Sequence, residues 1–184
     1  MSRSGLRRRP DSPPKENRAA PPRTKFAVDA MHGSLARKLR AIGFDSAYYM
    51  RGEDSGIIEL AARGGRVILS SDRSLVSRAS SCGLPAILLR GKSDGSRIRE
   101  ISLGAKRLGI ALRRGGSLCS LCGGELETLS RAGVSGLVPP SIERRHRLFF
   151  RCTSCGHLYW HGGHWKKLRS LTRQLGDESV ASFS

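Results

Sequence analysis

Short runs of apolar residues alternate with longer amphipathic stretches over the first two thirds of the chain. The runs are rich in Val, Ile and Leu and are bounded by Gly, Asp or Ser, a pattern that indicates buried strands. We expect strands at residues 26–28, 46–50, 66–70 and 85–90. In the stretches between them apolar residues recur every three or four positions, which indicates helices.

A helix is expected after each of these strands. The first has Ser34 as its N-cap and closes at Gly43, and the second covers residues 55–63. The third is a short turn of helix at residues 74–80, and the fourth spans residues 96–109. Strands that alternate with helices predict a mostly parallel α/β sheet flanked by helices, with right-handed crossovers.

The pattern changes at both ends of this region, which divides the chain. Residues 1–24 hold five of the eight prolines, and seven Lys and Arg against two acids, so we expect a disordered basic tail there. We place an α/β domain at residues 25–112 and a cysteine-bearing domain at residues 113–170. Residues 171–184 are expected to form a flexible C-terminal tail.

Acidic residues follow three of the expected strands. Asp29 comes directly after the first strand, and Asp72 follows the third with one serine between them. Glu53 and Asp54 lie between the second strand and its helix. Because the carboxyl ends of parallel strands meet at one edge of a sheet, these side chains should gather there. Oxygen ligands suit Mg²⁺ or Mn²⁺, so Asp29, Asp54 and Asp72 are candidate catalytic residues that hold such an ion.

Helix capping is the alternative role for two of these acids. Asp54 and Asp72 each stand where a helix begins, so each side chain could be an N-cap. Three neighbours are candidates for substrate binding: Ser70 through its hydroxyl, and Arg37 and Arg73 through contacts with phosphate. Both arginines are equally explained as solvated surface residues. His32 is expected at the surface or at the entry to the first helix and is assigned no role.

Four of the five cysteines form two Cys-x-x-Cys pairs, each followed by glycine. Cys119 and Cys122 are separated from Cys152 and Cys155 by 29 residues. Four thiolates around Zn²⁺ make a closed, structural site, and the metal should supply folding energy to so small a module. Two reduced thiol pairs or a redox motif remain the alternatives. Cys82 stands alone and is expected to be a small apolar filler.

Aromatic residues concentrate near the end of the second cysteine pair. Tyr159, Trp160 and Trp165 alternate there with His161 and His164. Tyr159 or Trp160 is expected to pack the cysteine-bearing domain against the first domain. Trp165 is a candidate for contact with an unpaired base of the substrate, because aromatic rings next to basic residues can stack on bases.

The charge of the chain favours a nucleic-acid partner. With 33 Lys and Arg against 15 Asp and Glu, the formal net charge is +18. Basic residues in the tail, the first helix and the segment RIRE…KR should bind phosphates without sequence preference. The alternative is a ribosome-associated protein or simply a soluble basic protein. We find no apolar run that could span a membrane and no secretory signal, so we expect no membrane partner and a cytoplasmic location.

The N-terminal domain resembles a known family. The segments KFAVDAMHGSLARKLRAIGFD and EDSGIIELAARGGRVILSSDRSLVSRA are similar to the Mut7-C RNase domain, a compact relative of the PIN nucleases. The resemblance implies a PIN-like fold and metal-dependent ribonuclease activity, with Asp29, Asp54 and Asp72 at the acidic positions. Ser74 stands where related domains often carry a further acid, which is compatible with one bound metal instead of two, or with weak activity.

The C-terminal domain resembles the zinc-ribbon half of the same family. The similarity rests on CSLCGGEL, VPPSIERRH and FFRCTSCGHLYWHGGHW, and altogether it covers residues 25 to about 168. The expectation is therefore an Mg²⁺- or Mn²⁺-dependent ribonuclease with a structural zinc ribbon that acts on single-stranded or structured RNA. The alternatives are a non-catalytic RNA- or ribosome-binding protein, and a toxin-like nuclease held silent by a protein partner.

Overall fold

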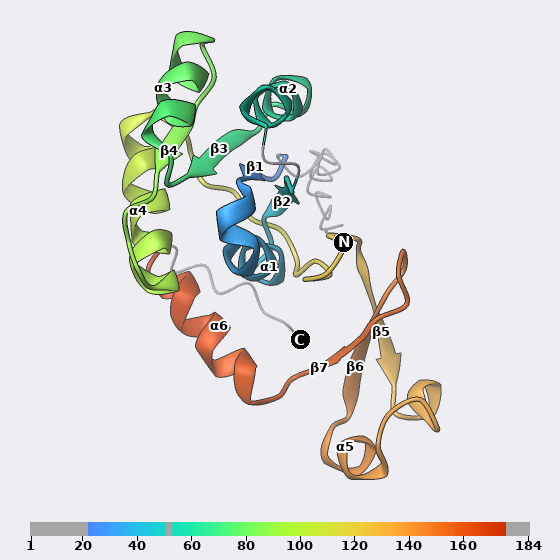
Figure 1. The fold of residues 1–184 in the computed structure, drawn as a ribbon. Coiled ribbons are helices and arrows are strands. Elements are labelled where there is room, and N and C mark those ends of the chain that lie inside the picture. Colours follow the sequence, from blue (N-terminus) through green and yellow to red (C-terminus); the bar gives the residue numbers. More distant parts are fainter. Residues whose placement is uncertain (1–21, 51–52, 176–184) are drawn as a thin grey trace, which may run out of the picture.

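The computed structural model describes residues 22–50 and 53–175, which form two sheets and the helices around them (Figure 1). Most of the expected N-terminal tail lies outside the described residues, as do residues 176–184 of the expected C-terminal tail. Among the helices in the described part of the chain, none combines the length and the apolar character needed to cross a lipid bilayer.

The first sheet has four parallel strands in the order β2-β1-β3-β4. Its strands are β1 (Lys25–Val28), β2 (Asp45–Tyr48), β3 (Val67–Ser70) and β4 (Ala86–Leu88). β1 and β3 lie in the middle, and all four residues of β3 are buried. The parallel α/β sheet expected from the alternation of strands and helices is therefore confirmed.

Helices cover both faces of this sheet (Figure 1). They are η1 (Ala30–His32), α1 (Gly33–Ala41), α2 (Asp54–Gly64), α3 (Arg73–Ser81) and α4 (Asp94–Arg107). Alternate strand residues point to opposite faces. Phe26 and Val28 pack with α1 and α4, whereas Ala27 and Ile68 pack with α2 and α3.

Local chemistry explains where the sequence located the helices well and where it did not. Gly65 closes α2 in the left-handed conformation, which fits the expected stop. The expectation of Ser34 as the first N-cap is wrong, because α1 begins at Gly33 and His32 occupies the cap position. Gly104 inside α4 allows close packing on β4, since a Cβ there would lie 2.7 Å from Cγ2 of Ile87.

The second sheet has three antiparallel strands in the order β5-β6-β7. Val134, Val138 and Phe149 form its small buried cluster, far smaller than the core of the first domain. Its elements are β5 (Leu126–Ser130), η2 (Ala132–Val134), α5 (Pro140–Arg145), β6 (Leu148–Cys152) and β7 (Leu158–Trp160).

After β7 the chain returns to the first domain through α6 (Gly163–Arg173). Leu171 and Leu175 are buried in the same core as α1 and α4, and the Ser102 hydroxyl donates to the Leu175 carbonyl at 3.3 Å. The domain boundary expected at residue 170 thus falls inside α6. This helix adds a layer to the parallel-sheet domain.

Candidate functional site

The hydroxyl of Ser70 connects two of the three candidate acids at the carboxyl edge of the sheet. Asp29 follows β1, and its backbone N–H donates to the Leu69 carbonyl of β3 at 3.1 Å. Ser70 is fully buried at the end of β3, and its hydroxyl donates to Oδ2 of Asp29 at 2.6 Å. The hydroxyl oxygen of Ser70 also accepts the backbone N–H of Asp72 at 2.9 Å. Ser70 therefore fixes Asp29 and the start of the Asp72 loop relative to each other.

Asp72 is the N-cap of α3, which confirms the capping alternative for this residue. Its Oδ1 accepts the backbone N–H groups of Ser74 at 2.7 Å and Leu75 at 3.4 Å. Both of these cap bonds use Oδ1, and Asp72 is exposed. Capping holds the carboxylate in one orientation and leaves Oδ2 outside the cap.

Asp54 has a different environment from the one expected for a cap. It is the first residue of α2, and the N-cap position belongs to Glu53, whose side chain makes no capping bond. The carboxylate of Asp54 forms an ion pair with Arg78 of α3. The helix-capping interpretation is therefore wrong for Asp54, whose side chain links α2 to α3.

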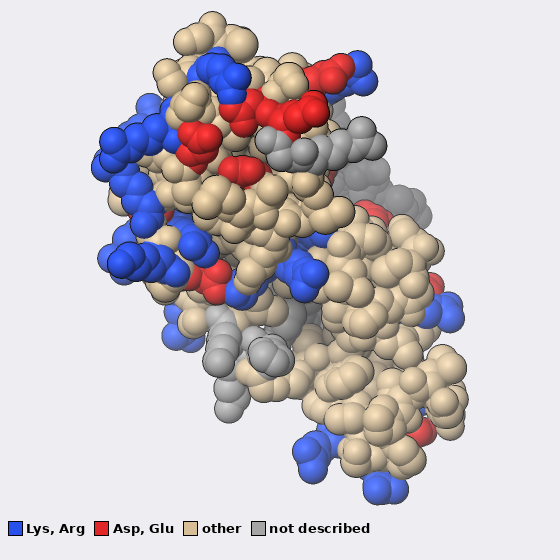
Figure 2. All heavy atoms as spheres, viewed as in Figure 1, with Lys and Arg blue, Asp and Glu red and all other residues tan. Residues whose placement is uncertain are grey.

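Figure 2 shows acidic side chains gathered over the region where α2 and α3 lie in Figure 1, with basic side chains beside them. Within the described residues, the carboxylate oxygens of Asp29, Asp54 and Asp72 do not all lie within 4.8 Å of one another. Mg²⁺ in proteins usually keeps several waters and is bound through one or two carboxylates. The donor chemistry of Asp29 and Asp72 fits such an ion, while Asp54 is engaged by Arg78.

His32 lies behind this edge, at the cap position of α1, so the expectation that it stands at the entry to the first helix is confirmed. It is only 3% exposed, so the alternative expectation of a surface residue is wrong. The Ser71 hydroxyl donates to the Leu89 carbonyl at 2.7 Å, so Nε2 of His32, 2.8 Å from the same hydroxyl, must be the donor to it. Burial lowers the pKa of His32, and so does the charge of Arg97, while Asp29 opposes both effects. A neutral imidazole therefore supports the loop that carries Asp72.

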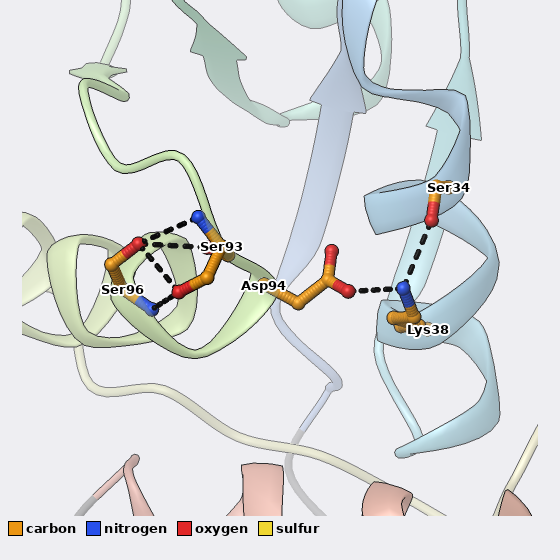
Figure 3. A network of polar contacts seen from close by, with 5 residues as sticks. All are labelled: Ser34, Lys38, Ser93, Asp94 and Ser96. Atoms are coloured by element: carbon orange, nitrogen blue, oxygen red, sulfur yellow. Dashed lines mark hydrogen bonds and ion pairs between the residues drawn. The ribbon is translucent and has the colours of Figure 1, made fainter.

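The basic residues of α1 have three different environments. Arg37 is exposed. Lys38 donates to the Ser34 hydroxyl at 2.9 Å and forms an ion pair with Asp94 at the start of α4, as Figure 3 shows. Arg40 is buried, with 8% exposure. Arg37 is therefore the residue of these three whose charge stays available to a phosphate, and Arg73 at the start of α3 is similarly exposed.

The proposed contact of Trp165 with a base cannot be related to the geometry of the edge, because that side chain lies outside the described residues. Trp160 is 36% exposed. The Tyr159 hydroxyl lies 3.1 Å from Sγ of Cys119 and 3.2 Å from the Ser120 hydroxyl. Tyr159 thus contacts the cysteine cluster itself, which its position in the sequence did not reveal.

The four paired cysteines converge on one point. Their sulfur atoms all lie within 4.8 Å of one another. Among the described residues, no other group of three or more His, Cys, Asp or Glu side chains brings its ligand atoms this close together. Sγ of Cys119 is 3.6 Å from Sγ of Cys155, and Sγ of Cys122 is 3.4 Å from Sγ of Cys152. Zn–S bonds of about 2.3 Å in a tetrahedron place sulfur atoms about 3.8 Å apart. The donor set fits a structural zinc ion.

Each cysteine pair lies in a tight turn closed by a glycine. The N–H of Gly123 donates to the Cys119 carbonyl at 2.8 Å, and that of Gly156 donates to the Cys152 carbonyl at 3.0 Å. Both glycines have positive φ, 84° and 73°, which other residues rarely adopt. By contrast, Cys82 is exposed at the end of α3, so the expectation that it fills the core is wrong.

The surroundings of Cys119 favour its thiolate form. Burial raises the pKa of this thiol, but hydrogen bonds from the Cys122 backbone N–H and the Tyr159 hydroxyl outweigh burial and lower the pKa to about 6. The thiolate is the form that binds metal ions. Cys119 is therefore a thiolate at neutral pH. For Cys155, a backbone hydrogen bond from His157 lowers the pKa, but desolvation and the neighbouring cysteines outweigh it and raise the pKa to about 12, as expected for thiols crowded together without a cation between them.

Arg40 joins the cysteine cluster to the first domain. Its Nη1 donates to the carbonyls of Ser120 at 3.2 Å and Leu121 at 2.7 Å, inside the first cysteine turn. Its Nε donates to the Ser46 carbonyl of β2 at 2.7 Å, and its own carbonyl accepts the N–H of Leu118 at 2.9 Å. Burial lowers the pKa of Arg40 and the nearby thiols of Cys122 and Cys119 raise it.

Comparison with known proteins agrees with these features. The family model of the Mut7-C RNAse domain matches residues 24–172, and the chain belongs to this family. Membership indicates a nuclease-like function, and the four-cysteine cluster indicates metal binding. No curated protein and no solved structure matches the chain.

Proposed function

We propose that this protein is a divalent-metal-dependent ribonuclease that hydrolyses phosphodiester bonds of RNA, and that Asp29, Asp54 and Asp72 hold its Mg²⁺ or Mn²⁺ ion. The observation that carries the proposal is the hydroxyl of Ser70, which ties Asp29 to the Asp72 loop at the carboxyl edge of the sheet. Membership in the Mut7-C RNAse domain family supports the same activity.

The residues of the chain would divide the chemistry between them. A bound ion would polarise the phosphodiester and lower the pKa of a water molecule for in-line attack. Asp29 is half-buried and its carboxylate is oriented by the Ser70 hydroxyl, which favours it as a ligand. The exposed guanidinium groups of Arg37 and Arg73 would bind non-bridging phosphate oxygens, which offsets the repulsion between the acids and the substrate.

Asp54 would join the site when its ion pair with Arg78 opens. A cation among three carboxylates removes the repulsion that otherwise disfavours their approach. Opening this ion pair should cost little free energy, because the Arg78 side chain is 56% exposed and an ion pair in contact with water is weak. We further propose that RNA, single-stranded or structured, is the partner of the protein, and that the zinc ribbon aids its binding, with the ribosome or another protein as a further partner.

Binding of Mn²⁺ tests the carboxylate site directly. Zinc-loaded protein is titrated with Mn²⁺ and free Mn²⁺ is followed by electron paramagnetic resonance. We expect one bound Mn²⁺ in the wild type, and much weaker binding in Asp29→Asn and Asp72→Asn, since each variant removes a ligand charge. A matched control is Asp45→Asn, at the opposite edge of the sheet, where Arg66 pairs with the carboxylate. Equal Mn²⁺ binding in all four proteins would contradict the proposal.

A second candidate is a non-catalytic RNA- or ribosome-binding protein. It is favoured by the structural roles of two of the acids, since Asp72 caps α3 and Asp54 forms an ion pair with Arg78. This candidate predicts RNA binding without cleavage under any divalent ion. It also predicts that Asp29→Asn leaves RNA affinity unchanged or improves it, because a negative charge is removed.

A further inference from the structure

The connection between β5 and β6 forms the end of the second sheet that lies away from the cysteines. In the antiparallel register, Leu126 pairs with Cys152 at one end and Ser130 pairs with Leu148 at the other. Since strands rise about 3.3 Å per residue, Leu148 lies about 13 Å along β6 from the metal ligand Cys152. We call residues 131–148 at this end the ribbon tip.

The ribbon tip is strongly basic, and Figure 2 shows basic side chains at the end of the molecule where α5 lies in Figure 1. All of its arginine side chains are exposed, and it holds a single acidic residue, Glu143. The ion pairs between described residues involve none of these arginines. The arginines are Arg131, Arg144, Arg145 and Arg147.

Helix stabilisation explains only part of this arrangement. Arg144 and Arg145 lie in the last turn of α5, where positive charge interacts favourably with the helix dipole. Arg131 and Arg147 lie outside the helix. Nη2 of Arg131 donates to the Arg144 carbonyl at 3.4 Å, so a third guanidinium lies at the C-terminal end of α5. Exposed like charges repel one another, and a bound polyanion would offset this repulsion among the arginines.

Apolar side chains lie among these charges. Leu137 is 61% exposed and Leu148 is 45% exposed, although buried Val134, Val138 and Phe149 are close to them in the chain. Guanidinium groups beside apolar side chains suit nucleotides whose bases are not paired, because the bases can then contact the apolar groups and stack on the guanidinium planes.

We propose that the ribbon tip binds unpaired nucleotides of RNA, with the arginines at the phosphates and Leu148 against a base or ribose. The inference rests on the proposed function in taking RNA as the partner, but it assigns a second contact surface outside the carboxyl edge. A substrate would then be held at the ribbon tip and cut at the sheet edge, so RNA long enough to reach both surfaces would be bound best.

The first test compares salt dependence of binding between matched variants. A fluorescent single-stranded oligouridylate is titrated with full-length protein without added divalent ions, so the readout does not depend on cleavage. Arg144→Gln/Arg145→Gln should reduce the slope of log K against log salt by about 1.4, because each lost phosphate contact on a single strand contributes about 0.7. The control Lys25→Gln/Arg63→Gln loses the same charge from exposed residues of β1 and α2 and should keep the wild-type slope.

The second test separates unpaired from paired RNA. Leu148→Thr removes apolar surface at an exposed strand position without changing charge, and should weaken binding of the single strand several-fold while binding of an RNA duplex stays unchanged. All variants must keep the wild-type zinc content and circular dichroism. Equal salt slopes for the two double variants would overturn the proposal and point to a protein partner. Equal weakening for single strand and duplex would overturn the assignment to unpaired nucleotides. Absence of nuclease activity would refute the proposed function and leave these binding results intact.

Discussion

Replacing Arg40 with methionine is expected to separate the cysteine cluster from the first domain. Methionine retains most of the apolar stem of the side chain but none of its donors. Arg40 is 8% exposed, and its guanidinium donates three hydrogen bonds, two of them to carbonyls inside the first cysteine turn. The variant therefore leaves three carbonyls without their donor while barely changing the packing.

The magnitude follows from the value of such bonds. A hydrogen bond that involves a charged group contributes about 1.5–3 kcal/mol, and the lost guanidinium also relieves the cost of burying a charge. We expect a net loss of about 3 kcal/mol in the free energy of unfolding. For a chain of this size that corresponds to a fall in Tm of about 6–12 °C. The loss of a positive charge beside zinc-bound thiolates should also reduce zinc affinity at least about 10-fold.

Two assays check this expectation. Thermal unfolding followed by circular dichroism gives the change in stability, and transfer of zinc to a colorimetric chelator gives the rate of metal release. Arg63→Met is the matched control, since the Arg63 side chain is 79% exposed and forms a surface ion pair with Glu59, and it should cost less than about 0.5 kcal/mol. If Arg40→Met behaves like this control in both assays, the reasoning about the domain link is refuted.

Three further predictions concern the site and its support. Ser70→Ala should lose about 1–3 kcal/mol of stability and most of the nuclease activity, because Asp29 loses its orienting hydrogen bond. Ser70→Thr retains the hydroxyl and should keep the activity. An active Ser70→Ala variant would argue against this role of Ser70. Cys122→Ser should bind less zinc by metal analysis and lose the cooperative unfolding of the second sheet, since a structural zinc ion would supply folding energy that the small buried cluster of this sheet does not. The pKa of His32 is lowered by folding, so the stability due to its neutral form is complete above about pH 6.5 and is lost as the pH falls. Between about pH 7 and about pH 5 the wild type should therefore lose more stability in denaturant titrations than His32→Gln, and parallel losses would contradict the assignment.

The parallel sheet and the cysteine cluster could be predicted because their signals are local. Short apolar runs that alternate with helical periodicity define the parallel sheet, and two Cys-x-x-Cys turns with trailing glycines define four ligands. The placement of Asp29 and Asp72 at one edge also followed from topology alone. The sequence did not predict which residue each side chain contacts through a hydrogen bond or an ion pair.

Arg40 illustrates the difference. It lies in the same helix as Arg37 and Lys38, and nothing in the spacing shows that one is buried under the cysteine turn while another is exposed. The ion pair between Asp54 and Arg78 likewise joins two helices whose relative position depends on the packed sheet.

The docking of α6 left a signal that could have been found. Leu168, Leu171 and Leu175 recur at helical spacing, and all three pack against the core of the first domain. That periodicity continues across the boundary expected at residue 170, so the pattern itself argued for one continuous helix.

Cleavage of RNA tests the central claim most directly. End-labelled single-stranded RNA is incubated with zinc-loaded protein and either Mn²⁺, Mg²⁺ or no added divalent ion, beside Asp29→Asn and the control Asp45→Asn. We predict cleavage that requires the added ion, that falls at least about 100-fold in Asp29→Asn, and that persists in the control. Cleavage that survives in Asp29→Asn, or RNA binding without any cleavage in the wild type, would contradict this prediction.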